Sequence, residues 1–342
     1  MACPSSPPAS LLVFDEAHHF VAEQWGTIAA QYTDARIIGV TATPERSDGA
    51  PLGDLFDELV VVASVRELTD QSFLVPCSVI APPKKRKTNA QSPLAAYREH
   101  AFGRPGVIFC ASVKEARDVA DQFTADGIAS ACVDGETDET VRADRLAAFE
   151  RREISVLTNC FVLTEGWDAP IAEVCILARG CSSVGTFLQM VGRVLRPAPG
   201  KTDALLIDLR GVVHTHGLPD EERTFSLDGK PIGRGPTKKC HACETKIPLA
   251  AMVCPLCGEE CPPARSLMGR FEAGEPLSRI DRAAIERAFW DEQIAEARRR
   301  GFKLGWAVHR FTEKFGRFPA KLWRELPCDV APSTSTIREG AR

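Results

Sequence analysis

Short apolar runs alternate with longer amphipathic segments along much of the chain. A short apolar run that ends in polar or turn residues is typical of a buried strand, whereas apolar residues spaced three and four apart indicate a helix. This pattern predicts strands at Leu11–Phe14 and at 36–40, 154–158, 172–177 and 203–209, and helices at 94–101, 113–126 and 283–300. Strands that alternate with helices predict an α/β fold with parallel sheets.

Two adjacent carboxylates, Asp15 and Glu16, follow directly after the first predicted strand. The carboxyl edge of a parallel sheet is where α/β proteins build ligand sites. One carboxylate there can hold Mg²⁺ on a nucleotide, and its neighbour can orient an attacking water. The alternative is an ordinary strand end with a solvated acidic pair.

Two threonines, Thr41 and Thr43, follow the predicted strand 36–40. Their hydroxyl groups could form hydrogen bonds that link a nucleotide site to a moving interface. The alternative is a plain strand-to-turn junction, because Pro44 ends regular strand pairing. The pattern gains weight because it follows Asp15-Glu-Ala-His18 at a short distance in the chain.

The order of these and later segments resembles the motif series of superfamily 2 helicases. Asp15-Glu-Ala-His18 resembles motif II, the Walker B box, and Thr41-Ala-Thr43 resembles motif III. Segments 106–112, 158–170 and 189–196 resemble motifs IV, V and VI, the last with the pattern Q-x-x-G-R-x-x-R. The resemblance covers about residues 10 to 260 and implies two RecA-like lobes. Its finer features are similar to RadD-like and phage-type DEAD/DEAH-box helicases, which carry a cysteine cluster and a basic helical tail.

The resemblance also implies roles for the residues of motifs II and III. Asp15 would coordinate Mg²⁺, and Glu16 would activate the water that attacks ATP. His18 would couple the nucleotide site to Gln189 of motif VI. Thr41 and Thr43 would relay that coupling.

Motifs V and VI would complete the implied site. Gly166 and Asp168 would line the nucleotide and nucleic-acid side of the cleft. Arg193 and Arg196 would reach the γ-phosphate as arginine fingers, a contribution that can be worth about 10³–10⁵ in rate. Met190 stands where the family often has arginine, a variation that occurs among DEAH-type relatives. Without the other motifs, the two arginines would be interpreted as solvated residues of a surface helix.

The phosphate-binding pattern G-x-x-x-x-G-K-[ST] does not occur in the sequence. Gly200-Lys-Thr202 is the nearest match, but Leu195 stands where the first glycine is needed, so we interpret it as a loop before a strand. We therefore expect a first lobe without its Walker A part, from a truncated or split gene or a non-hydrolysing remnant. Such a partial sheet would expose unpaired edges and apolar faces.

Cys240, Cys243, Cys254 and Cys257 form two C-x₂-C pairs. Each pair can place two thiolates on one metal ion, so together they predict a closed, structural Zn²⁺ site. His241 and Cys261 are alternative ligands that fit the spacing less well. Lys238 and Lys239, just before the first pair, could contact phosphate or could belong to a solvated linker.

Composition limits the classes of protein that fit. The 342 residues are 44% hydrophobic and 26% charged, which indicates a globular chain of two or three domains. The net charge of −4 means that nucleic-acid binding must come from local basic patches. We expect a cytoplasmic protein with reduced thiols, because the 13 cysteines come without a secretion signal or a long apolar run.

The last part of the chain is basic and rich in aromatic residues. Residues 265–342 hold 16 Lys and Arg against 11 Asp and Glu. Aromatic residues recur there at helical spacing among the cations: Phe302, Trp306, Phe311, Phe315 and Phe318. They could be the core of a small helical module, or could stack on bases while the cations follow the phosphates. The basic run in segment 82–89 is interpreted as a solvated linker, with nucleic-acid contact or a nuclear signal as alternatives.

These features predict an ATP-dependent DNA helicase or translocase of superfamily 2, active in DNA repair or phage DNA metabolism. ATP, Mg²⁺ and Zn²⁺ are the expected cofactors, and the resemblance favours DNA over RNA as partner. A separate protein or gene fragment could supply the Walker A half. The alternatives are a non-hydrolysing zinc-ribbon protein that binds nucleic acid, and the motor subunit of a restriction system. The predicted domains are a partial first lobe (1–82), a linker (83–93), a second lobe (94–222), a zinc ribbon (236–262), a basic helical tail (265–330) and a disordered end (331–342).

Overall fold

The computed structural model describes residues 8–19, 23–44, 51–83, 91–228, 237–240, 242–243, 246–248, 257, 259, 277–320 and 323. The chain forms two compact units, Met1–Ile280 and Asp281–Arg342, which are described separately. The predicted α/β fold with a parallel sheet is confirmed for the first unit. The chain's first residues, the basic run after Pro83, Cys254 and the expected disordered end lie outside the described residues.

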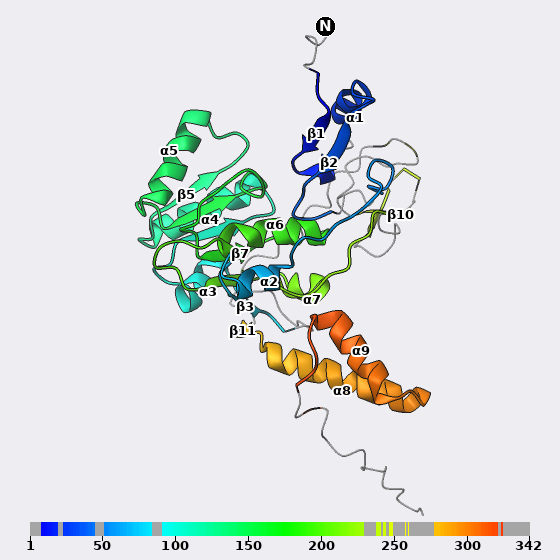
Figure 1. Ribbon diagram of the computed structural model, residues 1–342. Coiled ribbons are helices and arrows are strands. Elements are labelled where there is room, and N and C mark those ends of the chain that lie inside the picture. The colour runs from blue at the N-terminus through cyan, green and yellow to red at the C-terminus, as the bar shows by residue number, and fades with distance from the viewer. Residues whose placement is uncertain are drawn as a thin grey trace, which may run out of the picture. The chain divides into compact units, whose positions relative to one another are not determined.

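A small parallel sheet carries the first motifs (Figure 1). Strands β1 (Leu11–Phe14) and β2 (Arg36–Gly39) pair in register, and η1 (Ala17–His19) and α1 (Glu23–Ala30) lie between them in the chain. On one face Phe14 packs against Trp25 with ring centroids 5.2 Å apart. On the other face Leu11 and Val13 remain 48% and 59% exposed, so the strand is not fully buried and shows the open apolar face expected of a partial sheet.

The main sheet of the first unit has seven strands in the order β11-β3-β8-β7-β4-β6-β5. All neighbours are parallel except β11, which runs antiparallel to β3. The strands are β3 (Cys77–Ala81), β4 (Gly106–Phe109), β5 (Ser130–Val133), β6 (Val156–Asn159), β7 (Val174–Leu177), β8 (Ala204–Asp208) and β11 (Ser278–Arg279). The parallel sheet with its helices resembles a RecA-like helicase lobe.

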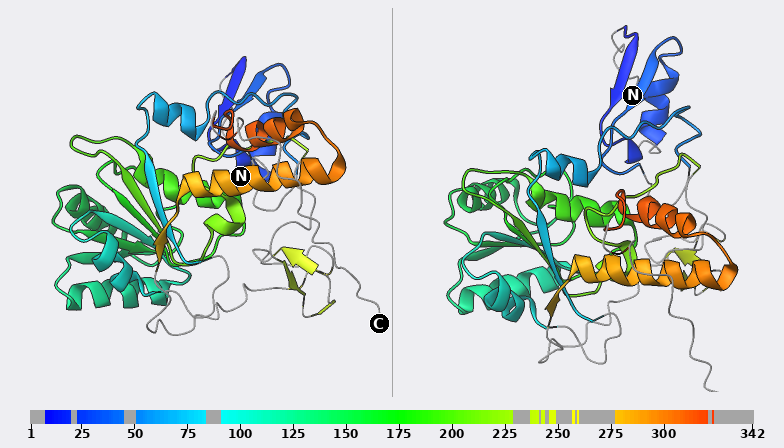
Figure 2. Two further views of the ribbon diagram at one scale, coloured as in Figure 1. Left: turned by 90° about the horizontal axis from the view of Figure 1, so that it is seen from below. Right: turned by 60° about the horizontal axis from the view of Figure 1, so that its bottom comes forward.

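Helices cover both faces of this sheet (Figure 2). Alternate strand residues point to opposite faces. Phe109 accordingly packs in the cluster that contains helix α6, and its neighbour Ile108 packs in the cluster that contains α3 and α4. The helices of this unit are α2 (Val65–Asp70), α3 (Pro93–His100), α4 (Val113–Ala125), α5 (Glu139–Glu150), α6 (Val184–Leu195) and α7 (Val213–His216). The central strands are therefore buried on both sides, which explains their continuous apolar sequence.

Polar caps determine where several of these helices begin. Ser92, Ser112 and Ser183 each accept a hydrogen bond from a backbone N–H of the following first turn, in α3, α4 and α6. Asp138 does the same for α5. Such caps satisfy backbone donors that have no partner inside the helix.

Two strands depart from the predicted domain limits. β3, at the end of the segment assigned to the first lobe, pairs with β8 of the large sheet. β11, inside the segment assigned to the basic tail, pairs with β3. Both segments are short, and hydrophobic pattern alone does not identify the sheet that a short strand will join. Strands β9 (Thr237–Lys239) and β10 (Lys246–Pro248) form a separate antiparallel pair near the cysteine cluster in sequence.

The described residues of the second unit form a pair of helices, α8 (Arg282–Arg300) and α9 (Leu304–Phe315). Phe311 and Phe315 are buried in its core with Trp290, whereas Phe302 and Phe318 are 45% and 66% exposed. Phe311 and Phe315 are therefore core residues of this helical pair, whereas Phe302 and Phe318 lie at its surface. No helix within the described ranges is both long enough and apolar enough to cross a membrane.

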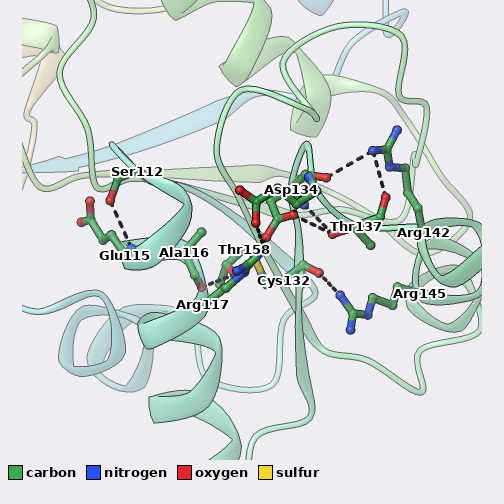
Figure 3. A network of polar contacts seen from close by, with 11 residues as sticks. Ser112, Glu115, Ala116, Arg117, Cys132, Asp134, Thr137, Arg142, Arg145 and Thr158 are labelled. Atoms are coloured by element: carbon green, nitrogen blue, oxygen red, sulfur yellow. Dashed lines mark hydrogen bonds and ion pairs between the residues drawn. The ribbon is translucent and has the colours of Figure 1, made fainter. Parts of the chain in front are cut away.

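A polar network holds the turn after β5 against α4 (Figure 3). Asp134 is 1% exposed, and its carboxylate accepts hydrogen bonds from Arg117, Thr137 and the backbone of Glu136. Burial alone would raise the pKa of Asp134, but these bonds outweigh it and lower the pKa to about 2. Arg145 adds a bond to the Cys132 carbonyl.

We expect Asp134 to stabilise the fold in a pH-dependent way. Because its folded pKa of about 2 lies below the ordinary value of 3.8, its contribution is complete above pH 4 and is lost as pH falls towards 2. Asp134→Asn should lower the free energy of unfolding at pH 7 by about 2 kcal/mol, and the difference from wild type should shrink below pH 4. Urea unfolding at several pH values measures this. Asp118→Asn, on an exposed ion pair, is the control, and an equal effect of both variants would contradict the prediction.

Candidate functional site

The acidic turn lies at the carboxyl end of β1, as expected. Glu16 has a φ of 49°, in the left-handed region that non-glycine residues seldom occupy, and Asp15 Oδ1 accepts a hydrogen bond from its backbone N–H. The turn is tied to β2 because Ala17 N donates to Val40 O. A Cβ at Gly39 would lie 2.7 Å from the Ala17 Cβ and 2.5 Å from the Phe56 ring, so the close packing beneath the turn requires glycine.

His18 joins three of the predicted motifs. Its Nδ1 lies 2.9 Å from Thr41 Oγ1, and its Nε2 lies 3.1 Å from the side-chain nitrogen of Gln189 on α6. The His18 side chain is 8% exposed, and Gln189 is also 8% exposed. The histidine of motif II therefore contacts motif III with one ring nitrogen and motif VI with the other.

The hydrogen-bond directions favour one tautomer of His18. Thr41 Oγ1 donates to Thr43 O, so it accepts from the histidine, and Nδ1 carries the proton. Nε2 is then the acceptor for the amide N–H of Gln189. The result is a continuous chain of donors and acceptors from α6 to the segment after β2. The Thr43 hydroxyl, which is 1% exposed overall, has no protein hydrogen-bond partner in the described part of the chain.

Two carboxylates flank this histidine. Glu16 Oε2 lies 3.4 Å from His18 Nδ1, and Glu165 Oε1 lies 3.8 Å from Nε2. Glu16 belongs to motif II and Glu165 to motif V. Motif V thus adds a charged residue to the cluster that the sequence analysis did not single out, although Glu165 directly precedes the predicted Gly166.

The two motif VI arginines contact motif V. Arg193 is 8% exposed, and its guanidinium donates to the carbonyl oxygens of Thr164 and Trp167, at 3.0 and 2.5 Å. Arg196 donates to Asp168 Oδ1 at 2.5 Å and to Trp167 O at 3.3 Å. Burial lowers the pKa of Arg193, and the positive charge of Arg196 adds to this effect.

Lys201, like the two arginines, donates hydrogen bonds to backbone carbonyl oxygens. Its Nζ donates to the carbonyl oxygens of Pro170, Ala172 and Arg196, at 3.0, 2.6 and 2.7 Å. Arg196 is the C-cap of α6, so the ammonium group satisfies a carbonyl at the helix end. Burial lowers the pKa of Lys201 to about 8, which leaves it mostly protonated at pH 7. The sequence analysis treated this lysine only as part of a loop, and its place just after a helix was the available signal.

The predicted residues do not form one cluster. His18, Thr41 and Gln189 are joined by hydrogen bonds, and Arg193, Arg196 and Asp168 form a second group around motif V. Asp15 is exposed, and its carboxylate accepts a hydrogen bond from the backbone N–H of Glu16 within the same turn. Gly166 has a φ of 69° with open space around it, so its backbone conformation, and not crowding, explains the glycine.

Three of the four predicted metal ligands lie together. The sulfur atoms of Cys240, Cys243 and Cys257 all lie within 4.8 Å of one another, with 3.6 Å between Cys240 and Cys257. A backbone hydrogen bond at Cys243 is the main cause that lowers the pKa of Cys240 to about 6, so its thiolate forms readily. This group could hold a metal ion. Cys254, His241 and Cys261 lie outside the described residues.

Two family descriptions match parts of the chain. Residues 89–198 match the family "Helicase conserved C-terminal domain", and residues 5–46 match "Type III restriction enzyme, res subunit". The first range contains motifs IV to VI and the second contains motifs II and III. Across motifs II to VI the chain is thus similar to the ATP-dependent helicases and translocases of superfamily 2.

Individual relatives agree with this family. A 51.5 kDa protein of a Lactococcus phage is 29% identical over 279 residues, covering 73% of this chain and 62% of the relative. A candidate mitochondrial ATP-dependent helicase of Schizosaccharomyces pombe, irc3, is 32% identical over 227 residues, 58% of this chain and 38% of the relative. The DNA 3'-5' translocase XPB2 of Sulfurisphaera tokodaii is 24% identical, with 58% of each chain covered. The chain spans less than two thirds of the length of each of these relatives.

A solved structure shares the fold. It is a fragment of a candidate HsdR subunit of a type I restriction enzyme from Vibrio vulnificus, with a TM-score of 0.50 and 24% sequence identity. The similarity covers 65% of this chain and 46% of that one. At this level of identity the likeness describes the fold alone.

We expect Lys201 to hold the motif V segment to the end of α6. Lys201→Met would leave three carbonyl oxygens without their donor and should lower the free energy of unfolding by about 2 kcal/mol. Chemical denaturation at pH 7 measures the change. Lys114→Met removes a lysine whose side chain is 85% exposed and should change stability by less than about 0.5 kcal/mol. Equal stabilities of the two variants would show that the three bonds contribute nothing.

Proposed function

We propose that this chain forms the coupling half of an ATP-driven DNA translocase of superfamily 2. The observation that carries the proposal is the hydrogen-bond chain from Gln189 through His18 to Thr41, which joins motifs VI, II and III. A shift of the side chain at one end of this series of hydrogen bonds changes the preferred position of the side chain at the other end. That is the requirement for linking nucleotide chemistry to movement on a nucleic acid.

Each site residue has a proposed role. Asp15 would hold Mg²⁺ on the nucleotide, a role that suits an exposed carboxylate at the end of a parallel strand. Glu16 would orient the attacking water, and its partly buried carboxylate beside His18 fits that task. Mg²⁺, when bound, would neutralise charge on the phosphates. Gly166 and Asp168 would line the nucleotide side of motif V.

Arg193 and Arg196 would stabilise the charge that develops on the γ-phosphate. In this structure both hold carbonyl oxygens of motif V, and Arg196 also holds Asp168. A phosphate offers the guanidinium group of an arginine an anionic acceptor of geometry similar to that of a carboxylate. We infer that nucleotide binding would redirect Arg196, which is 37% exposed, more readily than the buried Arg193.

We also propose that the small sheet works with a further polypeptide segment that supplies the phosphate-binding loop. A pair of parallel strands is seldom stable without additional strands or covering layers. One face of this pair is apolar and open, with Ile38 and Val40 47% and 45% exposed beside Leu11 and Val13. The 342 residues contain no G-x-x-x-x-G-K-[ST] pattern. A strand and loop of that type would cover apolar surface and complete the nucleotide site.

The motor subunit of a restriction system is a second candidate function. The match of residues 5–46 to the type III res subunit family favours it. A role in DNA repair or in phage DNA metabolism is favoured instead by the finer RadD-like resemblance and by the phage relative. Copurification with a DNA methylase or nuclease would separate these roles.

DNA binding and ATP hydrolysis test the main proposal. The purified chain should bind single-stranded DNA more tightly than RNA of the same sequence, as measured by fluorescence anisotropy. We expect ATP turnover by the chain alone to stay at background, because a phosphate-binding loop is required. DNA-stimulated turnover that is lost in Glu16→Gln would instead show that these 342 residues contain a complete motor. Absence of nucleic-acid binding would contradict the proposal.

We further propose that Cys240, Cys243, Cys254 and Cys257 bind one structural Zn²⁺. Four sulfur ligands at the Zn–S distance of about 2.3 Å lie about 3.8 Å apart in a tetrahedron, close to the 3.6 Å between Cys240 and Cys257. Metal ions bind thiolates, which the lowered pKa of Cys240 favours.

Metal analysis should find one zinc ion per purified chain. Cys240→Ser should lose most of the zinc and lower the melting temperature of its region, because it removes the buried ligand. Cys181→Ser, outside the cluster, should keep it. Zinc content equal in both variants, or absent from the wild-type chain, would refute the site.

A further inference from the structure

One feature of the large sheet has no role in the coupling site. Phe161, in the turn after β6, and Arg179, just after β7, meet at the carboxyl edge of the sheet, where the Arg179 guanidinium lies 3.6 Å from the centre of the Phe161 ring. Strands β6 and β7 both pair with β4, so the two side chains bridge the end of that strand. We call this pair the Phe161–Arg179 shelf.

Phe161 is exposed, and its backbone conformation is unfavourable. Its φ of 65° lies in the left-handed region, which is unfavourable for a large aromatic residue, and 56% of it is exposed. The turn is held by buried Asn159, whose side chain donates to Ile108 O and accepts from the backbone of Leu163. A rigid turn that presents a strained and exposed aromatic ring is not explained by core packing.

Arg179 has an unused donor. Among the described residues, its Nη1, which is shielded from water, has no hydrogen-bond partner, and its Nε donates only to the adjacent Gly180 carbonyl at 3.2 Å. Burial lowers the pKa of Arg179. Glu115 stands at the same edge, but its carboxylate accepts from Ala111 N and makes no ion pair with Arg179 among the described residues. A shielded cationic donor without an acceptor is costly unless a ligand supplies one.

A simple cation–π pair would explain the short contact. It does not explain the strained backbone of Phe161 or the unpaired Nη1 of Arg179, because surface cation–π pairs need neither. A ligand that combines a flat ring with an adjacent anion would use both groups. In a nucleic-acid strand, each base is followed by a phosphate, and in single strands the base face is free to stack.

We propose that the Phe161–Arg179 shelf binds one nucleotide of a single-stranded nucleic acid, with the base stacked on Phe161 and the neighbouring phosphate on Arg179. This inference rests on the proposed function, because it names two contacts of the nucleic acid that a translocase would hold. It adds a residue outside the recognised motifs, Arg179, and a stacking role for Phe161 of motif V.

Anisotropy titrations of the full chain with labelled oligothymidylate across a salt series test the shelf. Phe161→Ala should weaken binding about tenfold without changing the salt dependence. Arg179→Ala should weaken binding and also reduce the slope of log affinity against log salt by about 0.7, the value for one single-strand phosphate. Phe161→Leu keeps an apolar cover on Arg179 but removes the aromatic face, and it should behave like Phe161→Ala.

Each alanine variant of the shelf has a control that makes the same substitution at another surface position. Phe102→Ala removes a phenylalanine that is 71% exposed elsewhere, and Arg151→Ala removes an arginine paired with Glu153, and both should bind like wild type. With an abasic strand, the effect of Phe161→Ala should disappear while that of Arg179→Ala remains. Thermal unfolding of each variant confirms that it is folded.

The outcomes separate the two proposals. If the wild-type chain binds and the Phe161 and Arg179 variants bind like their controls, the shelf is refuted and the proposed function stands. If the wild-type chain binds no single strand, both are refuted. If Phe161→Leu binds like wild type while Phe161→Ala does not, base stacking is refuted.

Discussion

Helix α6 packs its apolar side against the seven-stranded sheet, and the polar contacts of the candidate site depend on that packing. Met190, Val191 and Val194 are fully buried in the same cluster as the alternate residues of β4, β7 and β8. With these side chains fixed, Gln189 and Arg193 must emerge on the other side of the helix, where His18 and motif V lie. The apolar packing on one side of the helix thus sets the position of the polar chemistry on the other.

Cationic side chains hold motif V through its backbone. Arg193, Arg196 and Lys201 donate between them to carbonyl oxygens from Thr164 to Ala172, and Lys201 also caps α6. Backbone carbonyls are neutral partners, so these contacts are weaker than full ion pairs with phosphate. An arrangement in which arginines rest on carbonyls can therefore respond to an arriving anion. This gives a physical basis for the proposed coupling without a large rearrangement of the sheet.

The two sheets of the first unit differ in how much of their apolar surface is buried. The large sheet is covered by helices on both faces, and its central strands are buried throughout. The small sheet has one packed face, with Phe14 and Ala17 at its centre, and one open apolar face. Yet the strained turn at Glu16 and the close approach at Gly39 are already formed there. The local geometry of motif II thus depends on short-range packing, whereas the stability of its sheet depends on additional cover.

Sequence pattern alone determined the α/β class and located strands β6, β7 and β8 and helices α3 and α4, because burial leaves a periodic signal in the sequence. The motif residues came from the resemblance to superfamily 2 helicases, because each motif is a local run of residues. The sequence also identified the cysteine pairs, whose spacing is a local property. It did not place β3 and β11 in the large sheet, since a short strand carries no record of its partner. Nor did it reveal the contacts of Glu165, Lys201 and Arg179, because these join segments distant in the chain. Only the tertiary structure brings such groups together, since packing of the sheet and its helices decides which side chains meet.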